Sequence, residues 1–130
     1  MAAGTHQKLK MLYLADILNK FTDEDNPLNA EEICGKLAQY GISAERKAIY
    51  NDIEMLILYG YDIVKTRTPR FGYFMASREL ELPEIYMLGD AVRSADFITS
   101  KKTRELLQKL DGMLSISQAK KRDKGIDAYM

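Results

Sequence analysis

The stretch ISAERKAIYNDIEMLILYGY, residues 42–61, decides how the rest of this chain is interpreted. On a helical wheel of about 100° per residue, one side is an apolar stripe made of Ile49, Ile53, Leu56 and Ile57. The opposite side carries groups that donate or accept hydrogen bonds, namely Ser43, Lys47, Tyr50, Asn51 and Glu54. The pattern predicts a helix over residues 43–59, capped by Ser43 and closed by Gly60, with one face in a core and one toward a polar partner.

The first turn of this predicted helix breaks an electrostatic rule. Helix N-termini carry partial positive charge and favour acids, yet Glu45 is followed at once by Arg46 and Lys47. Each cation costs roughly a few tenths of a kcal/mol there. A local rule broken at one place often marks a functional site, and backbone N–H groups with two cations would hold an anion. The alternative is that both are solvated surface charges.

Composition narrows the class of protein. The chain has 130 residues, of which 46% are hydrophobic and 29% charged, as in a globular domain. Its 19 basic and 19 acidic residues cancel, so any electropositive surface must be local. One cysteine and no apolar signal or membrane-spanning run predict a cytoplasmic protein with no membrane partner.

Two helices are expected before residue 42. Residues 8–21 are apolar around most of the predicted helix, which indicates burial on several sides. Asn29 and Glu32 have the spacing of a capping box, Leu28 and Ile33 that of a hydrophobic staple, and Gly41 that of a helix stop. A close neighbouring helix would explain Gly35 in mid-helix. Only residues 41–42 then separate this helix from the next, which is the helix-turn-helix pattern.

The period changes from helical to alternating after Gly60. Residues 62–66 and 71–76 are short, β-branched or aromatic strands joined by a turn containing Pro69, and they predict a β-hairpin wing over 62–76. Lys65, Arg67 and Arg70 lie at or near its tip. The alternative role for these charges is protection of a sheet edge. The expected fold is mainly α with a small β-hairpin, a winged helix-turn-helix followed by two additional helices.

The rest of the chain predicts helices at 83–97 and 100–114, then a tail without periodicity. We therefore expect a winged domain over 1–78, a helical extension over 79–117 and a flexible tail over 118–130. The extension would form a homodimer through 83–97 and 100–114, or pack back on the winged domain as a cap.

Groups for catalysis are scarce. The only histidine, His6, lies in an N-terminus expected to be mobile, and the only cysteine, Cys34, is expected to be a small buried thiol. The sequence has no phosphate-binding glycine loop and no metal-ligand spacing. Nor does it contain an aromatic RNA-stacking signature. We expect no enzyme, no cofactor and no metal.

Double-stranded DNA is the expected partner. The helix supplies Ser43, Arg46, Lys47, Tyr50, Asn51 and Glu54 for a major groove, and the hairpin supplies Lys65, Arg67 and Arg70 for the backbone. These nine positions include five cations, and if most of them contact phosphate the log–log salt slope should be about −4 per protomer.

The segments SAERKAIYNDIEMLILYGYDI (43–63), FGYFMASRELELPEI (71–85) and DAVRSADFITSKKTRELLQKL (90–110) resemble bacterial transcriptional regulators that contain a WYL domain. The resemblance covers roughly residues 8–120 and implies a DeoR-like winged module that binds DNA. This chain ends before a WYL domain would begin, so the family's ligand-sensing role is not carried over. It also has Asn51 where that family usually has Arg. The alternative function is a protein-interaction module that forms mixed dimers with a full-length regulator.

Overall fold

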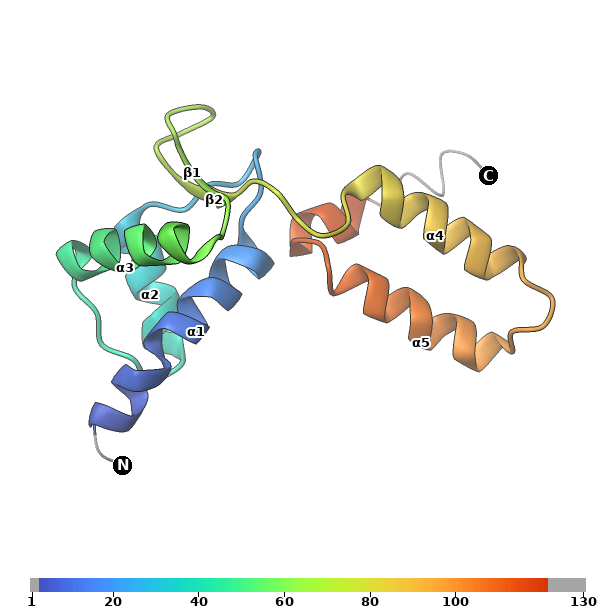
Figure 1. Cartoon of the computed structure of the whole chain (residues 1–130), viewed down its shortest axis with the longest axis horizontal. Coiled ribbons are helices and arrows are strands. Elements are labelled where there is room, and N and C mark those ends of the chain that lie inside the picture. Colours follow the sequence, from blue (N-terminus) through green and yellow to red (C-terminus); the bar gives the residue numbers. More distant parts are fainter. Residues whose placement is uncertain (1–2, 122–130) are drawn as a thin grey trace. The chain divides into compact units, whose positions relative to one another are not determined.

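The computed structural model describes residues 3–121 of the chain, which divides into two compact units, 1–77 and 78–130 (Figure 1). The first unit contains α1 (Ala3–Phe21), α2 (Ala30–Gln39), α3 (Arg46–Tyr59), β1 (Ile63–Thr66) and β2 (Gly72–Met75). The second contains α4 (Leu82–Ser94), α5 (Ser100–Asp111) and a helical segment over 116–121. The described chain is therefore mainly helical with a small antiparallel sheet, which confirms the predicted class at that level.

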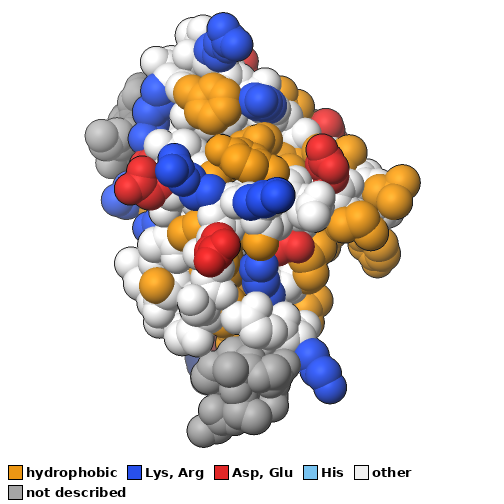
Figure 2. All heavy atoms as spheres, turned by 90° about the vertical axis from the view of Figure 1, so that its left-hand side faces the viewer, with side chains coloured by type: hydrophobic (Ala, Val, Ile, Leu, Met, Phe, Trp, Pro, Cys, Tyr) orange, Lys and Arg blue, Asp and Glu red, His pale blue; other side chains and the backbone are white. Residues whose placement is uncertain are grey.

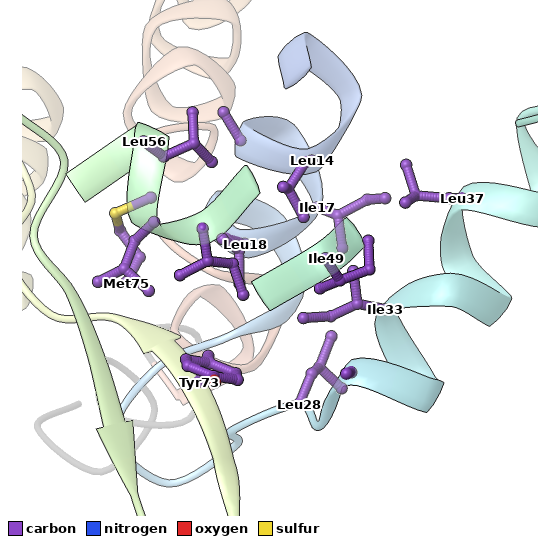
Figure 3. Packing of buried hydrophobic residues seen from close by; sticks show 14 of the residues in the cluster. Leu14, Ile17, Leu18, Leu28, Ile33, Leu37, Ile49, Leu56, Tyr73 and Met75 are labelled. Atoms are coloured by element: carbon purple, nitrogen blue, oxygen red, sulfur yellow. The ribbon is translucent and has the colours of Figure 1, made fainter. Parts of the chain in front are cut away.

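The core of the first unit lies where α1, α2, α3 and β2 meet (Figure 3). Each element points apolar side chains into it, including Leu14, Ile17 and Leu18 from α1, Ile33 and Leu37 from α2, Ile49, Ile53 and Leu56 from α3, and Tyr73 and Met75 from β2. Full burial of one such aliphatic side chain contributes about 1.5–3 kcal/mol. The core stripe predicted for α3 is confirmed for Ile49, Ile53 and Leu56. The prediction for Ile57 is wrong, since this side chain is 46% exposed.

The start of α2 is as its sequence predicts. Asn29 Oδ1 accepts from the Glu32 N–H at 2.8 Å, and Glu32 Oε1 accepts from the Asn29 N–H at 3.0 Å, which completes the capping box. At the other end, Gly41 has a φ of 77°. The Ile42 N–H then reaches back to the Leu37 carbonyl at 3.1 Å in a Schellman motif.

The Schellman motif places the start of α3 later in the chain than predicted. Ile42 is drawn into the core and is 1% exposed, so the chain must run on before it can turn into the next helix. Glu45 is the N-cap and Arg46 the first helical residue. The prediction that Ser43 caps the helix is therefore wrong by two positions, and the connection from α2 is longer than the two residues expected. Ser43 stays in this link, where its carbonyl accepts from Gln7 Nε2 at 2.9 Å.

The hairpin is held to the helices by backbone contacts. Its register pairs Lys65 with Tyr73, and Tyr73 also exchanges hydrogen bonds of 2.7 and 2.9 Å with Leu28 in the link before α2. The close approach of that link requires Gly72, because a Cβ there would lie 2.8 Å from Leu28 backbone atoms. Thr22, fully buried, accepts from the Met75 N–H at 2.9 Å and so ties β2 to the end of α1.

Several helix expectations need correction. α1 begins at Ala3, so the backbone of His6 is helical, although the sequence before residue 8 has no apolar period that predicts a helix. One side of α1 is solvent-exposed, with Leu12 at 68%. A Cβ added at Gly35 would meet no atom within 4 Å, so no close helix explains this glycine.

The second unit is a pair of helices. Glu81 and Glu84 form a capping box at the start of α4, and Thr99 caps α5 by accepting from the Lys102 N–H at 3.2 Å. Both helices end three residues earlier than predicted, at Ser94 and Asp111. Gly89 is buried on the side of α4 that meets Leu107 of α5.

The helical segment 116–121 was not expected. Its cap is reciprocal, since Ser115 Oγ accepts from the Gln118 N–H at 3.0 Å and Gln118 Oε1 accepts from the Ser115 N–H at 3.1 Å. The sequence SISQ is thus a capping box that the loss of apolar period concealed. The remainder of the predicted flexible tail, 122–130, lies outside the described residues.

Candidate nucleic-acid interface

One face of α3 remains uncovered by the rest of its unit. Helical spacing puts its polar side chains on that face, and each is exposed: Arg46, Lys47, Tyr50, Asn51 and Glu54. Ser43, in the extended link, is exposed as well. The face is polar because the buried stripe of Ile49, Ile53 and Leu56 fixes how the helix is rotated against the core.

The N-terminus of α3 lacks the groups that usually neutralise it. Because the helix begins at Arg46, Glu45 becomes the N-cap and the first turn contains no acid at all. The Glu45 side chain makes no capping hydrogen bond to the first-turn N–H groups. Arg46 and Lys47 therefore occupy the first two helical positions beside uncapped backbone donors. The electrostatic anomaly seen in the sequence is larger in the structure than predicted.

An ion pair joins α3 to α1. Lys10 Nζ of α1 lies 2.8 Å from Asp52 Oδ2 of α3, with 12% and 22% of the two side chains exposed. Asp52 sits between Asn51 and the buried Ile53, so the contact also sets the direction in which the exposed face points. Sequence analysis missed this pair, because nothing in the local pattern links residues 10 and 52.

The three cations of the hairpin are not equivalent. Lys65 and Arg67 are exposed, with Lys65 Nζ 5.3 Å from the centroid of the Phe71 ring. Arg70 instead turns toward α2, where its Nη1 donates to Glu32 Oε2 at 2.8 Å and Oε1 at 3.0 Å. Lys65, Arg67 and Arg70 are thus all exposed, but Arg70 is engaged by Glu32 of α2.

Glu32 serves both its helix cap and this ion pair. Partial burial raises the pKa of Glu32, but the Asn29 N–H and the Arg70 guanidinium outweigh it, so the pKa falls below the ordinary value of 4.5. The carboxylate is therefore charged at neutral pH and holds Arg70 in place.

A hollow of about 420 Å³ lies between α3 and the hairpin. Tyr50 and Glu54 line it from α3, and Lys65, Phe71 and Tyr73 line it from the hairpin. Burial raises the pKa of the Tyr73 hydroxyl, with smaller contributions from Tyr50 and Glu54. Sequence analysis treated Phe71 and Tyr73 only as strand formers. Their place beside Tyr50 depends on the packing of the hairpin against α3, which no local pattern encodes.

Figure 2 looks from the left-hand side of Figure 1 and shows the charge on this side of the molecule. Lys and Arg side chains gather around exposed hydrophobic groups in the upper half of the view, with a few Asp and Glu side chains among them. The chain has no net charge, so a basic region of this kind is local. Among the nine candidate residues, Glu54 supplies the only acid.

The described residues give less support to a reactive cysteine, a metal site or a membrane-spanning helix. Cys34 is half-buried, and burial raises the pKa of its thiol above 9.0 despite the nearby Lys10 and Arg46, which fits a packing role. Within residues 3–121, no His, Cys, Asp and Glu side chains group to hold a metal ion. No helix in that part of the chain combines the length and apolar character needed to cross a bilayer.

Comparisons with known proteins add no family. No protein-family model, curated protein or solved structure matches this chain.

Proposed function

We propose that residues 1–77 form a winged helix-turn-helix that binds double-stranded DNA, with α3 in the major groove and the β1–β2 hairpin on the adjacent backbone. The observation that carries the proposal is the exposed polar face of α3, uncapped and without acid in its first turn, beside a hairpin with three exposed cations, of which Arg70 is engaged by Glu32. That face has hydrogen-bonding groups in place of the acids that a solvated helix start would favour.

The dimensions of α3 suit a groove. From Arg46 to Glu54 the face extends about 12 Å at 1.5 Å per residue, similar to the roughly 12 Å width of the major groove of B-DNA. A helix about 10 Å across fits that groove end-on or lengthwise. Entry by the N-terminal end would bring Arg46 and the uncapped N–H groups to a phosphate.

The side chains on this face have distinct chemical roles in the proposal. Arg46 and Lys47 neutralise phosphates, Asn51 pairs with adenine, and Glu54 accepts from cytosine N4. Ser43 and Tyr50 carry hydroxyls for phosphate oxygens. The resemblance to WYL-domain regulators supports the same assignment, and Asn51, in place of their usual Arg, exchanges a cation for an adenine-reading amide.

Selection of bound sites from a pool of random duplexes tests this function. The chain should enrich a sequence, and a Lys47→Ala/Arg67→Ala double variant should lose that enrichment. Both side chains are exposed, so the variant should fold as the parent does. The proposal fails if the double variant recovers the same sites with the same affinity, or if the parent enriches none.

We also propose that the second unit makes the protein a homodimer. The helix pair buries few residues of its own, since α5 has none and Leu106, Leu107 and Leu110 are only half-buried. Large apolar side chains in this unit stay in solvent, with Met87 at 71%, Leu88 at 41% and Phe97 at 89% exposed. A second copy would cover them, and a dimer would place two α3 helices on successive half-sites of DNA.

Charge favours a second copy over an unrelated partner. α4 has two acids, Glu84 and Asp90, against one base, Arg93, and Asp96 follows it. α5 has four bases against two acids. Packing α4 of one protomer against α5 of the other therefore opposes unlike charges twice in a symmetric pair.

A second candidate function is protein binding by the first unit. The C-terminal half of α3 leaves four large apolar side chains in solvent: Met55 at 56%, Ile57 at 46%, Leu58 at 78% and Tyr59 at 82%. Exposed apolar clusters mark contact surfaces, and a full-length regulator with a similar module would be the partner. A Leu58→Ser/Tyr59→Ser variant separates the two candidates, because it would abolish mixed dimers yet leave duplex binding intact.

A further inference from the structure

We propose that the hollow between α3 and the β1–β2 hairpin binds one unpaired base of single-stranded nucleic acid. This goes beyond duplex recognition, because bases within a duplex are stacked and cannot enter a pocket. It shares Tyr50, Glu54 and Lys65 with the proposed duplex surface but does not require α3 to enter a groove.

The hollow has an apolar floor and aromatic walls. Ile53, Ile63 and Tyr73 are buried beneath it, whereas Tyr50 and Phe71 are 41% and 42% exposed at its sides. Its volume of about 420 Å³ falls in the range of small-ligand sites. Partly exposed rings over a buried floor can contact a base that enters the hollow.

The three rings form one connected group. The Tyr50 and Tyr73 centroids are 6.3 Å apart with their planes at 52°, and the Phe71 and Tyr73 centroids are 6.4 Å apart at 71°. Tyr73 is paired on both edges of β2, with Lys65 of β1 on one edge and with Leu28 on the other, so the group has a rigid centre. Aromatic side chains in a positively charged groove are the platforms on which single-stranded nucleic acids stack their bases.

The charges at the hollow fit a nucleotide rather than an apolar side chain. Lys65 is exposed with its Nζ over the Phe71 ring, 5.3 Å from the centroid, and by moving off that ring it would meet the phosphate of a nucleotide whose base stacks there. Glu54, on the other wall, would accept from an exocyclic amine of the base. Adenine, cytosine and guanine carry such an amine, whereas thymine and uracil do not. The hollow should therefore prefer the three amino bases.

A fluorescent base tests this directly. A thymidine decamer with one central 2-aminopurine, which has an exocyclic amine, is titrated with the full chain, and stacking on the hollow should quench its fluorescence. Phe71→Leu keeps an apolar side chain but removes the ring, and it should weaken binding roughly tenfold. The matched control is Tyr59→Leu, which removes an aromatic ring that is 82% exposed at the end of α3, outside the hollow.

Competition experiments test which base the hollow prefers and whether the ligand is RNA or DNA. Unlabelled decamers with adenine, cytosine or guanine at the central position should compete better than one with thymine or an abasic site, and Glu54→Gln should narrow that difference. Ribose versions show whether the source is RNA or DNA. Equal competition by the abasic decamer, or an unchanged affinity in Phe71→Leu, would overturn the inference. If Phe71→Leu loses single-strand binding but keeps duplex binding, the proposed function is unaffected. If the parent binds the single-stranded decamer but no duplex, the proposed function fails and the present inference is unaffected.

Discussion

Arg70 Nη1 lies 2.8 Å from Glu32 Oε2, so the base of the hairpin turn is joined to the first turn of α2. The contact links residues 38 positions apart and uses a carboxylate that already completes a helix cap. It also reduces the number of cations available at the proposed DNA surface. Of the five cations expected there, Arg70 stabilises the hairpin position, which leaves Arg46, Lys47, Lys65 and Arg67 for phosphates.

Replacing Arg70 should separate these two roles. Arg70→Gln should cost about 0.2–1 kcal/mol of unfolding free energy, because the pair is half-exposed, and should leave the salt slope of DNA binding unchanged. Arg67→Gln is the matched control and should reduce that slope by about 0.9. Chemical denaturation and anisotropy titrations measure the two quantities. A slope lowered by Arg70→Gln would show that Arg70 does contact phosphate.

The Glu32 carboxylate should make stability depend on acid pH. Its pKa in the folded chain lies below 4.5, so its contribution is complete above that pH and is lost as the pH falls through the folded pKa. Glu32→Gln keeps an oxygen for the cap but loses the ion pair. The gap in unfolding free energy between parent and variant should be constant from neutral pH to about 5 and close below 4.5. A gap that persists at pH 3 would contradict the assignment.

Two glycine substitutions should act in opposite directions. Gly35→Ala, in mid-helix with open space around it, should stabilise the chain by about 0.5–1 kcal/mol. Gly72→Ala should destabilise it by roughly 1–3 kcal/mol, because the new Cβ would meet Leu28 backbone at 2.8 Å. Thermal unfolding of both variants measures the signs. Equal effects would mean that the link before α2 does not approach β2 as described.

Charge reversal should test the homodimer. A chain with Asp90→Lys and Asp96→Lys has a basic α4 and a basic residue in the loop after it, and one with Lys101→Glu and Lys109→Glu has an acidic α5, with two bases against four acids. Each should dimerise less than the parent, since like charges then face each other across the pair. Mixed together, they should recover dimers by restoring both contacts. Sedimentation velocity distinguishes these states, and variants that dimerise as the parent does would exclude the α4–α5 pairing.

Local chemistry made part of the fold predictable. The capping box of Asn29 and Glu32 and the stop at Gly41 are short-range patterns, and each appears in the structure. The buried stripe of α3 follows from its period. The start of α3 was misplaced because Ser43 is a good cap by type, whereas the Schellman motif at Ile42 determines where the chain can turn.

Contacts between segments far apart in the sequence could not be predicted from the sequence. The exposed face of α3 could be predicted because it is the complement of the core stripe. The engagement of Arg70 by Glu32, the Lys10–Asp52 ion pair and the place of Phe71 beside Tyr50 all depend on tertiary packing. These contacts decide which cations are available and where an aromatic pocket forms, so the candidate site is sharper in the structure than in the sequence.

The salt dependence of duplex binding tests the central claim most directly. Affinity for a selected duplex, measured by anisotropy from 50 to 300 mM KCl, should fall with a log–log slope of about −3.6 per protomer, as four phosphate contacts require. Arg46→Gln/Lys47→Gln should reduce the magnitude of that slope by about 1.8. No measurable duplex binding at 50 mM, or a slope unchanged in the variant, would contradict the account.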